Sequence, residues 1–409
     1  MTTFGKNSLA TLLFTIKWED SAGKYEDSYL ARRVNVWRDI FPIGLEKALT
    51  GCVAGDSVTL NYEPGKFMEW FYDRKVLTLK RNQICFLEEH ACEPELVKGR
   101  YYPQGVLRGV SQIFPQNTTP CRLLEFDDEK VVVDCNHPIA KIPLEMTVTI
   151  QHVEDKRSDT GGELNRWSES ICNYGPGMQT MPDGHFLELS EKFFSRTDEK
   201  DDAVFYGEPR IISHIDGQAR ANLTDIYSRF LKPEMQVLDL MSSVDSHLPE
   251  DTELNVFGLG MNSAELEQNG RLFEYVVHDL NKEPDFSNVV EKASDADEGF
   301  DLALCSLSIE YLTKPLEVLQ SVHGQLKDDG AMLVSFSDRW FPTKAISGWR
   351  DMHPFERSGL VLQWLKQAGF KGKAGAISMR NDWRPTDDKY YMETRGVSDP
   401  VFVVWAYKK

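Results

Sequence analysis

The stretch "VLDLMSSVDSHLPEDTELNVFGLGMN", residues 237–262, decides the fold of the second half of this chain. A buried-looking strand ends near an acidic residue, Asp239, a polar loop follows, and a second apolar strand leads to "GLGMN". That frame is typical of a nucleotide-binding strand–loop–helix unit, whose glycines let the backbone approach a ligand. The loop here, "MSSVDSHLP" at residues 241–249, has no glycine. The frame therefore raises the question of whether a ligand is still held.

The alternation of strand and helix continues along the chain. Strands are expected at "MQVLDLM", "NVFGLGM", "YVVHDL", "FDLALCSL" and "AMLVSFS", and helices at "AELEQNGRL" and "PLEVLQSVHGQLK". A further polar helix is expected directly after "MQVLDLM". Strands that alternate with helices form a parallel sheet with crossover helices. The sequence therefore predicts an α/β domain over residues 201–409.

The first 155 residues have a different texture. Short alternating runs, "SLATLLFTIKW", "DSVTLNY", "KVVVDC" and "MTVTIQHV", are separated by turn residues and predict a mainly β domain. The opening segment is expected to be a first strand and not a signal peptide, because its apolar run is short and broken by Thr and Lys. Residues 156–200 are rich in Gly, Ser, Asp and Pro, which favours a linker or long loop.

Composition excludes several classes of function. The net charge of −18 argues against nucleic acid as a partner, because phosphate binding needs a basic patch. No apolar run is long enough to span a membrane. The seven cysteines are scattered, without a C-x-x-C pair, which is typical of reduced thiols and predicts a cytoplasmic protein. His, Cys and carboxylate residues show no metal-ligand spacing, so no metal site is predicted.

Two motifs of the N-terminal part form an ordered pair. They are "FPIGLEKALTGCVAGDSVTLNYEPGKF", from Phe41, and "NHPIA", residues 136–140. Together they resemble the FKBP-type prolyl isomerases of the SlyD kind. The resemblance implies a FKBP-like domain over residues 1–155, with a chaperone flap inserted at about 68–134. It also implies a prolyl pocket, for which the candidate residues are Asp27, Ile43 and Phe67.

The order of elements in the C-terminal part resembles class I methyltransferases, which use S-adenosylmethionine. The resemblance implies a Rossmann-like domain and a cofactor site where the parallel strands end. It also implies that the N-terminal segment of this domain, residues 202–231, forms a lid over the cofactor pocket. Asp239 would bind the amino group of the cofactor, and Asp279 the amino group of its adenine. The full set of cofactor-binding residues expected is Tyr206, Arg210, Asp239, Met241, Ser242, Ser243, Gly260, Met261, Asn262, Asp279, Leu280, Asn281, Cys305 and Ser306.

Two departures from that family bear on the cofactor. Ser242 and Ser243 replace glycines, and their amides and hydroxyls suit the amino-acid end of S-adenosylmethionine while still capping a helix. Gly260 stands where an acid usually holds the ribose. Asn262 is then the expected ribose partner, and Met261 is expected to pack on adenine. A methyltransferase-like domain without activity is the alternative.

Residues on either side of the predicted sheet are candidates for catalysis and for binding the acceptor. Arg210 is expected to bind the cofactor carboxylate. His214, His247 and His353 are the candidate general bases, although His214 and Asp216 fit helix capping equally well. The aromatic and basic side chains expected around the acceptor are Trp340, Phe341 and Lys344, together with Arg339.

The sequence thus predicts a methyltransferase that acts on a small-molecule acceptor through a sulfur, oxygen or nitrogen nucleophile. A second interpretation is a protein methyltransferase whose FKBP-like domain recruits an unfolded or proline-containing client. A third is a peptidyl-prolyl isomerase or chaperone that carries an inert methyltransferase-like domain.

Overall fold

The structure, a computed structural model, describes residues 2–86, 95–156, 164–175, 186–293 and 299–409. The chain forms two compact units. The first comprises Met1–Leu189 together with Asp351–Gly359, and the second comprises Ser190–Arg350 and Leu360–Lys409.

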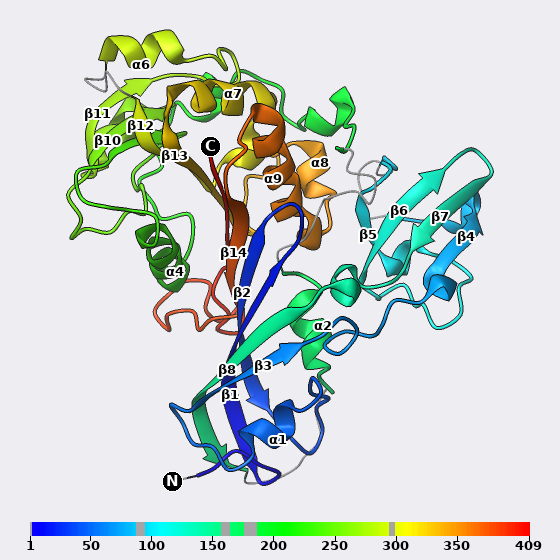
Figure 1. Ribbon diagram of the computed structural model, residues 1–409. Coiled ribbons are helices and arrows are strands. Elements are labelled where there is room, and N and C mark those ends of the chain that lie inside the picture. Colours follow the sequence, from blue (N-terminus) through cyan, green and yellow to red (C-terminus); the bar gives the residue numbers. More distant parts are fainter. Residues whose placement is uncertain (1, 87–94, 157–163, 176–185, 294–298) are drawn as a thin grey trace. The chain divides into compact units, whose positions relative to one another are not determined.

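The second unit is built on a seven-stranded stretch of sheet in the order β11-β10-β9-β12-β13-β15-β14. Strands β11 to β13 in this order are parallel, and β15 is antiparallel to both of its neighbours (Figure 1). The strands are β9 (Gln236–Leu240), β10 (Asn255–Gly260), β11 (Leu272–Val277), β12 (Phe300–Ser306), β13 (Leu326–Phe336), β14 (Ala374–Arg380) and β15 (Val401–Tyr407). The predicted α/β fold is confirmed for this part of the chain.

Helices cover this sheet. They are α3 (Asp202–Phe205), α4 (Gly217–Ser228), α5 (Ser263–Gln268), α6 (Ser287–Ala293), α7 (Pro315–Gln325), α8 (Ser347–Arg350) and α9 (Arg357–Ala368), with short 3₁₀ turns at Glu191–Phe194 and Ile309–Tyr311. Asp216 caps α4 by accepting from the amides of Gln218 and Ala219. Helices α4 and α7 lie on opposite sides of the sheet (Figure 1). The apolar stripe of α4, including Leu223 and Ile226, is fully buried in one core cluster with residues of β9, β12 and β15.

One predicted element is wrong. Residues 241–254, between β9 and β10, contain no helix, although a polar helix was expected there and Ser242 was expected to cap it. Hydroxyl and amide groups of this loop donate to carboxylates and do not cap a helix. Ser242 donates to Asp239, and Asp245 accepts from the backbone amide of His247. His247 itself has a φ of 56°, a left-handed conformation that interrupts a right-handed helix.

The first unit contains two antiparallel sheets. The larger has the order β2-β1-β8-β3, and its strands are β1 (Ser8–Glu19), β2 (Lys24–Val34), β3 (Ser57–Tyr62) and β8 (Leu144–Asp155). Every second side chain of β1 is buried, which is the pattern of a strand with one face in a core. The short helices are α1 (Leu45–Leu49) and α2 (Trp167–Cys172), with 3₁₀ turns at Asp73–Lys75, Arg81–Gln83, Gln104–Val106, Pro138–Lys141 and Pro354–Glu356.

The second sheet of this unit lies between β3 and β8 in the sequence. Its order is β4-β7-β6-β5, with bounds β4 (Val76–Lys80), β5 (Tyr101–Pro103), β6 (Pro120–Phe126) and β7 (Lys130–Asp134) (Figure 1). The structure thus has a mainly β first unit with an insertion in the sequence range predicted for the flap, of which residues 87–94 lie outside the described part. The resemblance of this unit to FKBP and SlyD proteins stays a prediction.

The segment Asp351–Gly359 is held by residues of this insertion. The Arg100 guanidinium, 2% exposed, pairs with the fully buried Glu356 carboxylate at 2.8 Å, and the Tyr101 amide donates to the same carboxylate at 2.9 Å. The Phe355 ring packs edge-on against the Tyr101 ring, with centroids 5.2 Å apart. A piece of the chain's own sequence therefore covers β5.

Part of the predicted linker, residues 156–200, packs against the first unit. The Trp167 ring is buried, stacks with Phe14 at 6.3 Å, and donates its indole N–H to Asp39 at 3.1 Å. Residues 157–163 and 176–185 lie outside the described residues. The segment around Trp167 is therefore fixed within the first unit, and the linker or loop over residues 156–200 stays a prediction.

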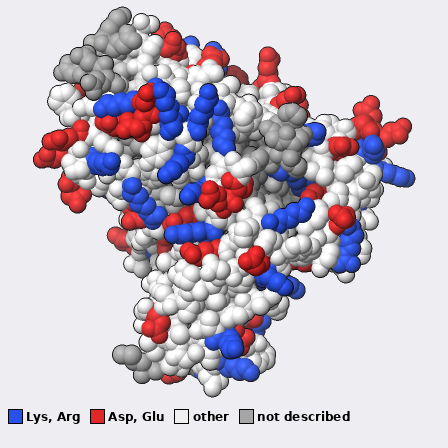
Figure 2. Space-filling model, viewed as in Figure 1, with Lys and Arg blue, Asp and Glu red and all other residues white. Residues whose placement is uncertain are grey.

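Charged residues of both signs are interspersed on the face of the molecule drawn in Figure 2, without a continuous basic patch there. Within the described residues, no helix combines the length and the apolar character needed to cross a bilayer.

Candidate functional site

A cavity of about 340 Å³ opens where β9 and β12 end. Ligands of open parallel sheets bind at the carboxyl ends of the strands, so the cavity lies where the fold predicts a site. Its walls come from the loop after β9, the end of β12, the segment before α4 and the loops after β13 and β14. The predicted site residues that line it are Tyr206, Arg210, His214, Asp239, Met241, Ser242, Ser243, His247, Met261, Ser306, Trp340 and Phe341.

Asp239 is the most deeply buried of the acidic residues that line this cavity. Its side chain is 1% exposed, and its Oδ2 accepts hydrogen bonds from Ser242 Oγ at 2.7 Å and Ser246 Oγ at 2.6 Å. Burial raises the pKa of Asp239 to about 6, and the two hydroxyl donors only partly oppose the effect. The carboxylate is therefore charged above neutral pH and gains from a cationic partner.

The loop after β9 keeps the backbone close to the cavity without glycine. Met241 has a φ of 53°, in the left-handed region that a glycine would adopt more easily. The Ser242 amide donates to the Leu259 carbonyl at 2.7 Å, and Ser243 Oγ donates to Glu265 at 2.6 Å. These bonds fix the loop on β10 and α5, so that its serines border the cavity.

Arg210 is a positive charge in the same cavity. Its guanidinium lies over the rings of Phe205, at 4.5 Å, and Phe341, at 5.4 Å. One N–H donates to the Phe205 carbonyl at 2.9 Å. Among the described residues no carboxylate pairs with this guanidinium. An anionic ligand would supply the missing partner.

Two of the three predicted histidines line the cavity. Burial lowers the pKa of His214, whose ring packs edge-on to Phe341 with centroids 5.7 Å apart. His247 is buried, with Nδ1 3.3 Å from the Asp245 carboxylate. Burial raises the pKa of Asp245, but His247 and Arg220 outweigh that effect and hold it well below its usual range.

His353 is not among the residues that line this cavity. It lies in the first unit, where Nε2 is 2.7 Å from the Thr118 carbonyl oxygen and Nδ1 accepts from the Phe355 amide at 3.1 Å. Nδ1 thus caps the 3₁₀ turn that starts at Pro354, while Nε2 holds the Thr118 carbonyl. Burial also lowers its pKa, in keeping with a structural, neutral ring.

The residues predicted to hold the nucleoside border a second, much smaller hollow. Its volume is about 20 Å³, room for about one water molecule. Of the predicted residues it is lined by Tyr206, Met241, Gly260, Met261, Asp279, Leu280 and Asn281, and Asp202, His278, Tyr311 and Leu312 complete the wall.

Polar groups around this hollow are already engaged. Asn262 caps α5 through its Oδ1 and donates its amide to the Tyr206 carbonyl at 2.8 Å. Asp279 Oδ1 accepts from the backbone amides of Asn281, at 3.0 Å, and Lys282, at 3.3 Å. A Cβ at Gly260 would lie 2.3 Å from the Ser242 carbonyl oxygen, so an acid does not fit there.

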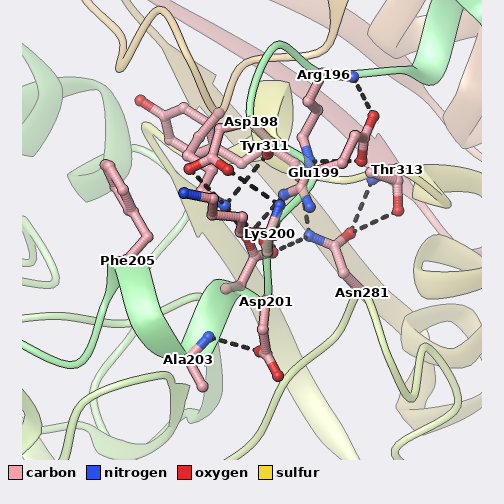
Figure 3. Close-up of polar contacts among 12 residues, drawn as sticks. Arg196, Asp198, Glu199, Lys200, Asp201, Ala203, Phe205, Asn281, Tyr311 and Thr313 are labelled. Carbon is pink, nitrogen blue, oxygen red and sulfur yellow. Dashed lines mark hydrogen bonds and ion pairs between the residues drawn. The ribbon is translucent and has the colours of Figure 1, made fainter.

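A polar cluster adjoins the same hollow, which Asp202 and Asn281 line. Figure 3 labels its members Arg196, Asn281 and Thr313. Asp202 accepts from Arg196 at 2.8 Å and from Asn281 Nδ2 at 2.9 Å, and Lys344 Nζ lies 3.0 Å away. The Asn281 Oδ1 accepts from the amide and hydroxyl of Thr313.

This cluster corrects the role predicted for Lys344. Its side chain is 0% exposed, is absent from the cavity wall and also donates to the Lys200 carbonyl at 2.9 Å. A lysine so enclosed does not meet an acceptor. Trp340 and Phe341 do line the cavity, together with Arg339.

Cys305 and Ser306, the last two residues of β12, have different surroundings. Cys305 is buried away from the cavity beside Leu280, and burial raises the pKa of its thiol. Ser306 reaches the cavity, and its Oγ lies 2.8 Å from the Tyr227 hydroxyl.

Several lining residues were missed from sequence, namely Asp245, Glu265, Ser308, Tyr311, Asp388, Lys389 and Tyr390. The last three come from the long loop between β14 and β15. Nothing in their local sequence marks them, because the turn of that loop alone brings them to the cavity.

Of the prolyl-pocket candidates in the first unit, Asp27 lies on β2, and Ile43 and Phe67 lie in loops. The Phe67 ring packs edge-on against Tyr62 at 5.4 Å, and the Tyr62 hydroxyl donates to the Ile43 carbonyl at 3.0 Å. Ile43 is 68% exposed, whereas Asp27 is buried on β2. The structure thus links Ile43 and Phe67 through Tyr62.

No protein-family model and no curated protein matches this chain. The [4+2]-cyclase SpnF is similar in structure, with 15% identity over 51% of this chain and 90% of that chain, and a TM-score of 0.32. A methyltransferase dependent on S-adenosylmethionine from Archaeoglobus fulgidus has 14% identity over 47% of this chain and 93% of its own, with a TM-score of 0.32. A possible histamine N-methyltransferase from Thermotoga maritima has 15% identity, covers 47% and 90% of the two chains, and has a TM-score of 0.33.

Several of the matching structures are described as S-adenosylmethionine-dependent methyltransferases, and each of these matches covers about half of this chain. At such identities and TM-scores, function is inferred from the site residues themselves.

Proposed function

We propose that this chain is an S-adenosylmethionine-dependent methyltransferase that acts on a small-molecule acceptor. One observation carries the proposal: a buried carboxylate, Asp239, and an Arg210 guanidinium without a carboxylate partner among the described residues line the same cavity. An α-amino acid presents an ammonium and a carboxylate, which such a pair recognises through charge-assisted hydrogen bonds. The methionine part of the cofactor has both groups.

The residues fit the amino-acid half of the cofactor. Asp239 would bind the ammonium, Arg210 the carboxylate, and the serine loop borders the rest. The nucleoside half does not fit while Asp202 and Tyr206 occupy their present places, because the hollow there measures about 20 Å³. When bound, S-adenosylmethionine supplies an electrophilic methyl group on a sulfonium.

The remaining cavity wall indicates the acceptor class. The rings of Trp340, Phe341 and Tyr390 provide an apolar surface. Arg339 lies 4.6 Å above the Tyr390 ring and 3.5 Å from Asp399, a carboxylate that Arg384 also binds. A small acceptor with an apolar body and an anionic group fits this wall. His214, kept neutral by its lowered pKa, would take the proton from an oxygen or nitrogen nucleophile.

The experiment is transfer of an isotopically labelled methyl group from S-adenosylmethionine to a panel of small aromatic and aliphatic acids and their uncharged amides. We expect transfer to acids, and a loss of about tenfold or more in Arg339→Met, as for a lost charged hydrogen bond. Lys371→Met, an exposed lysine outside the cavity, is the matched control. Equal transfer to acids and amides by wild type and Arg339→Met would refute the acceptor class, and no transfer at all would count against the methyltransferase.

A second candidate is favoured by the exposed apolar side chains near Phe67. Ile43 is 68% exposed and Trp70 is 53% exposed, and the Trp70 ring covers Gly65. We propose that a proline-containing client binds here, for isomerisation, as in SlyD-like proteins, or for methylation. Because Asp351–Gly359 already covers β5, this patch and not β5 is the candidate client surface.

A protease-coupled proline-peptide assay tests this second candidate. We expect acceleration that falls in Phe67→Ala. If the isomerisation rate stays at its uncatalysed value and the full chain retains no peptide, this second candidate is excluded.

A further inference from the structure

Residues 195–207, here named the strap, border the nucleoside half of the site. Two of its side chains, Asp202 and Tyr206, form the wall opposite Gly260, Asp279 and Leu280. All residues of the strap are described. Its helix α3 is a single turn, so its position depends on side-chain contacts and not on a long helical core.

Asp202 fastens the strap. The carboxylate is 5% exposed and bonds to the Arg196 guanidinium, to Lys344 Nζ at 3.0 Å and to Asn281 Nδ2 at 2.9 Å. Burial raises its pKa, but these donors outweigh burial, and the pKa lies below the usual range. Asp202 is therefore ionised at neutral pH and paired with two cations.

The strap also takes donors that were expected to serve the nucleoside. The Asn262 side-chain amide donates to the Tyr206 carbonyl at 2.8 Å and the Gly207 carbonyl at 3.2 Å. The Asn281 amide donates to Asp202 and to the Tyr311 carbonyl at 3.0 Å. Both amide groups are thus occupied by protein.

The position of the Tyr206 ring in the hollow leaves its hydroxyl buried without a hydrogen-bond partner among the described residues, which is unfavourable. A hydroxyl in that state has lost its bonds to water and gained none, so withdrawal of the ring would recover them. The docked strap is therefore less favourable than its ion pairs alone indicate.

We propose that the strap is a built-in competitor of the nucleoside: it holds the nucleoside half of the site shut and must withdraw before an adenosine-containing ligand binds. The inference rests on the proposed function, since that function places the adenosine here. On withdrawal, Asn262 and Asn281 become free to bond the ribose and adenine. The apparent affinity is then the intrinsic affinity reduced by the fraction of molecules with the strap withdrawn.

The first test is amide hydrogen exchange of the full chain with and without S-adenosylhomocysteine, and with adenosine. The amides of Val204 and Tyr206 donate to the backbone carbonyls of Asp201 and Asp202 within the strap. They should exchange faster by about tenfold or more once a ligand holds the strap out. Unchanged or slower exchange under saturating ligand would overturn the proposal while leaving the methyltransferase intact.

The second test is calorimetric affinity in Tyr206→Ala, with Val204→Ala as the control on the same turn, since Val204 is 75% exposed. Adenosine and S-adenosylhomocysteine should bind Tyr206→Ala on the order of tenfold more tightly than wild type, and Val204→Ala as wild type does. Equal affinity in all three chains would overturn the strap proposal alone. No binding to any of them would overturn both the strap and the proposed cofactor.

Discussion

Ser246 Oγ donates a hydrogen bond of 2.6 Å to Asp239 Oδ2, and both side chains are almost completely buried. The donated hydrogen bond favours the charged form of the acid, whereas burial opposes that form more strongly. The pKa of Asp239 is accordingly raised from 3.8 to about 6. The acid that is expected to bind the cofactor therefore destabilises the fold when it is ionised.

The first prediction concerns the stability of Asp239→Asn at two pH values. Because the pKa in the folded chain lies above the unfolded value, the folded chain binds more protons between pH 4 and 6, and stability falls as pH rises through this window. The amide stays neutral, so the variant should gain about 2 kcal/mol over wild type on going from pH 4.5 to 7.5. Urea unfolding at both values measures this gain, and a pH-independent difference would contradict the raised pKa.

Gly260→Ala should destabilise the second unit, because a Cβ there would lie 2.3 Å from the Ser242 carbonyl and 2.9 Å from Leu266. The expected loss is about 1–3 kcal/mol, as for overpacking in a core. Gly270→Ala is the matched control, since a Cβ at that nearby glycine meets nothing within 4 Å. If thermal unfolding shows the two variants to be equally stable, the close approach of the serine loop to β10 is wrong.

Glu356→Gln should strongly destabilise the first unit. It leaves the Arg100 guanidinium, 2% exposed, without its carboxylate, and breaking a buried pair typically costs about 3–5 kcal/mol. The double variant Arg100→Met with Glu356→Leu should recover much of this loss, because no charge is then left buried. Asp328→Asn, which breaks the exposed pair with Lys409, should change nothing measurable. Urea unfolding of the four chains tests the order.

Arg210→Met separates the two halves of the cofactor site. The variant should bind S-adenosylhomocysteine about tenfold to a hundredfold more weakly, since a charged hydrogen bond to the carboxylate is lost. Its affinity for adenosine, which has no carboxylate, should stay within about twofold of wild type. A parallel loss for both ligands in calorimetry would show that Arg210 acts by positioning Phe205 or Phe341 and not by binding the carboxylate.

The α/β fold was predictable because each strand was a short apolar run in the right order. The absence of a helix between β9 and β10 was not predictable, because polar residues such as Ser242 and Asp245 suit both a helix start and a hydrogen-bonded loop. The left-handed φ of His247 has no sequence signal of its own.

The site was predictable where residues follow a strand end, as for Asp239, Ser242 and Met261. It was not predictable where distant loops meet. Lys344 is three residues after Phe341, yet its side chain is buried in an ion pair with Asp202. His353 belongs to the other unit. Tyr390 reaches the cavity only through the path of a long loop. Such placements depend on tertiary contacts that a single sequence does not display.

The most direct test of the central claim is a calorimetric titration of S-adenosylhomocysteine into the full chain at pH 7.5, beside Asp239→Asn and Tyr206→Ala. We predict saturable binding to wild type, weaker by about tenfold or more in Asp239→Asn, where the charged partner of the ammonium is lost. Absence of binding to both wild type and Tyr206→Ala would contradict the claim that this cavity holds the cofactor.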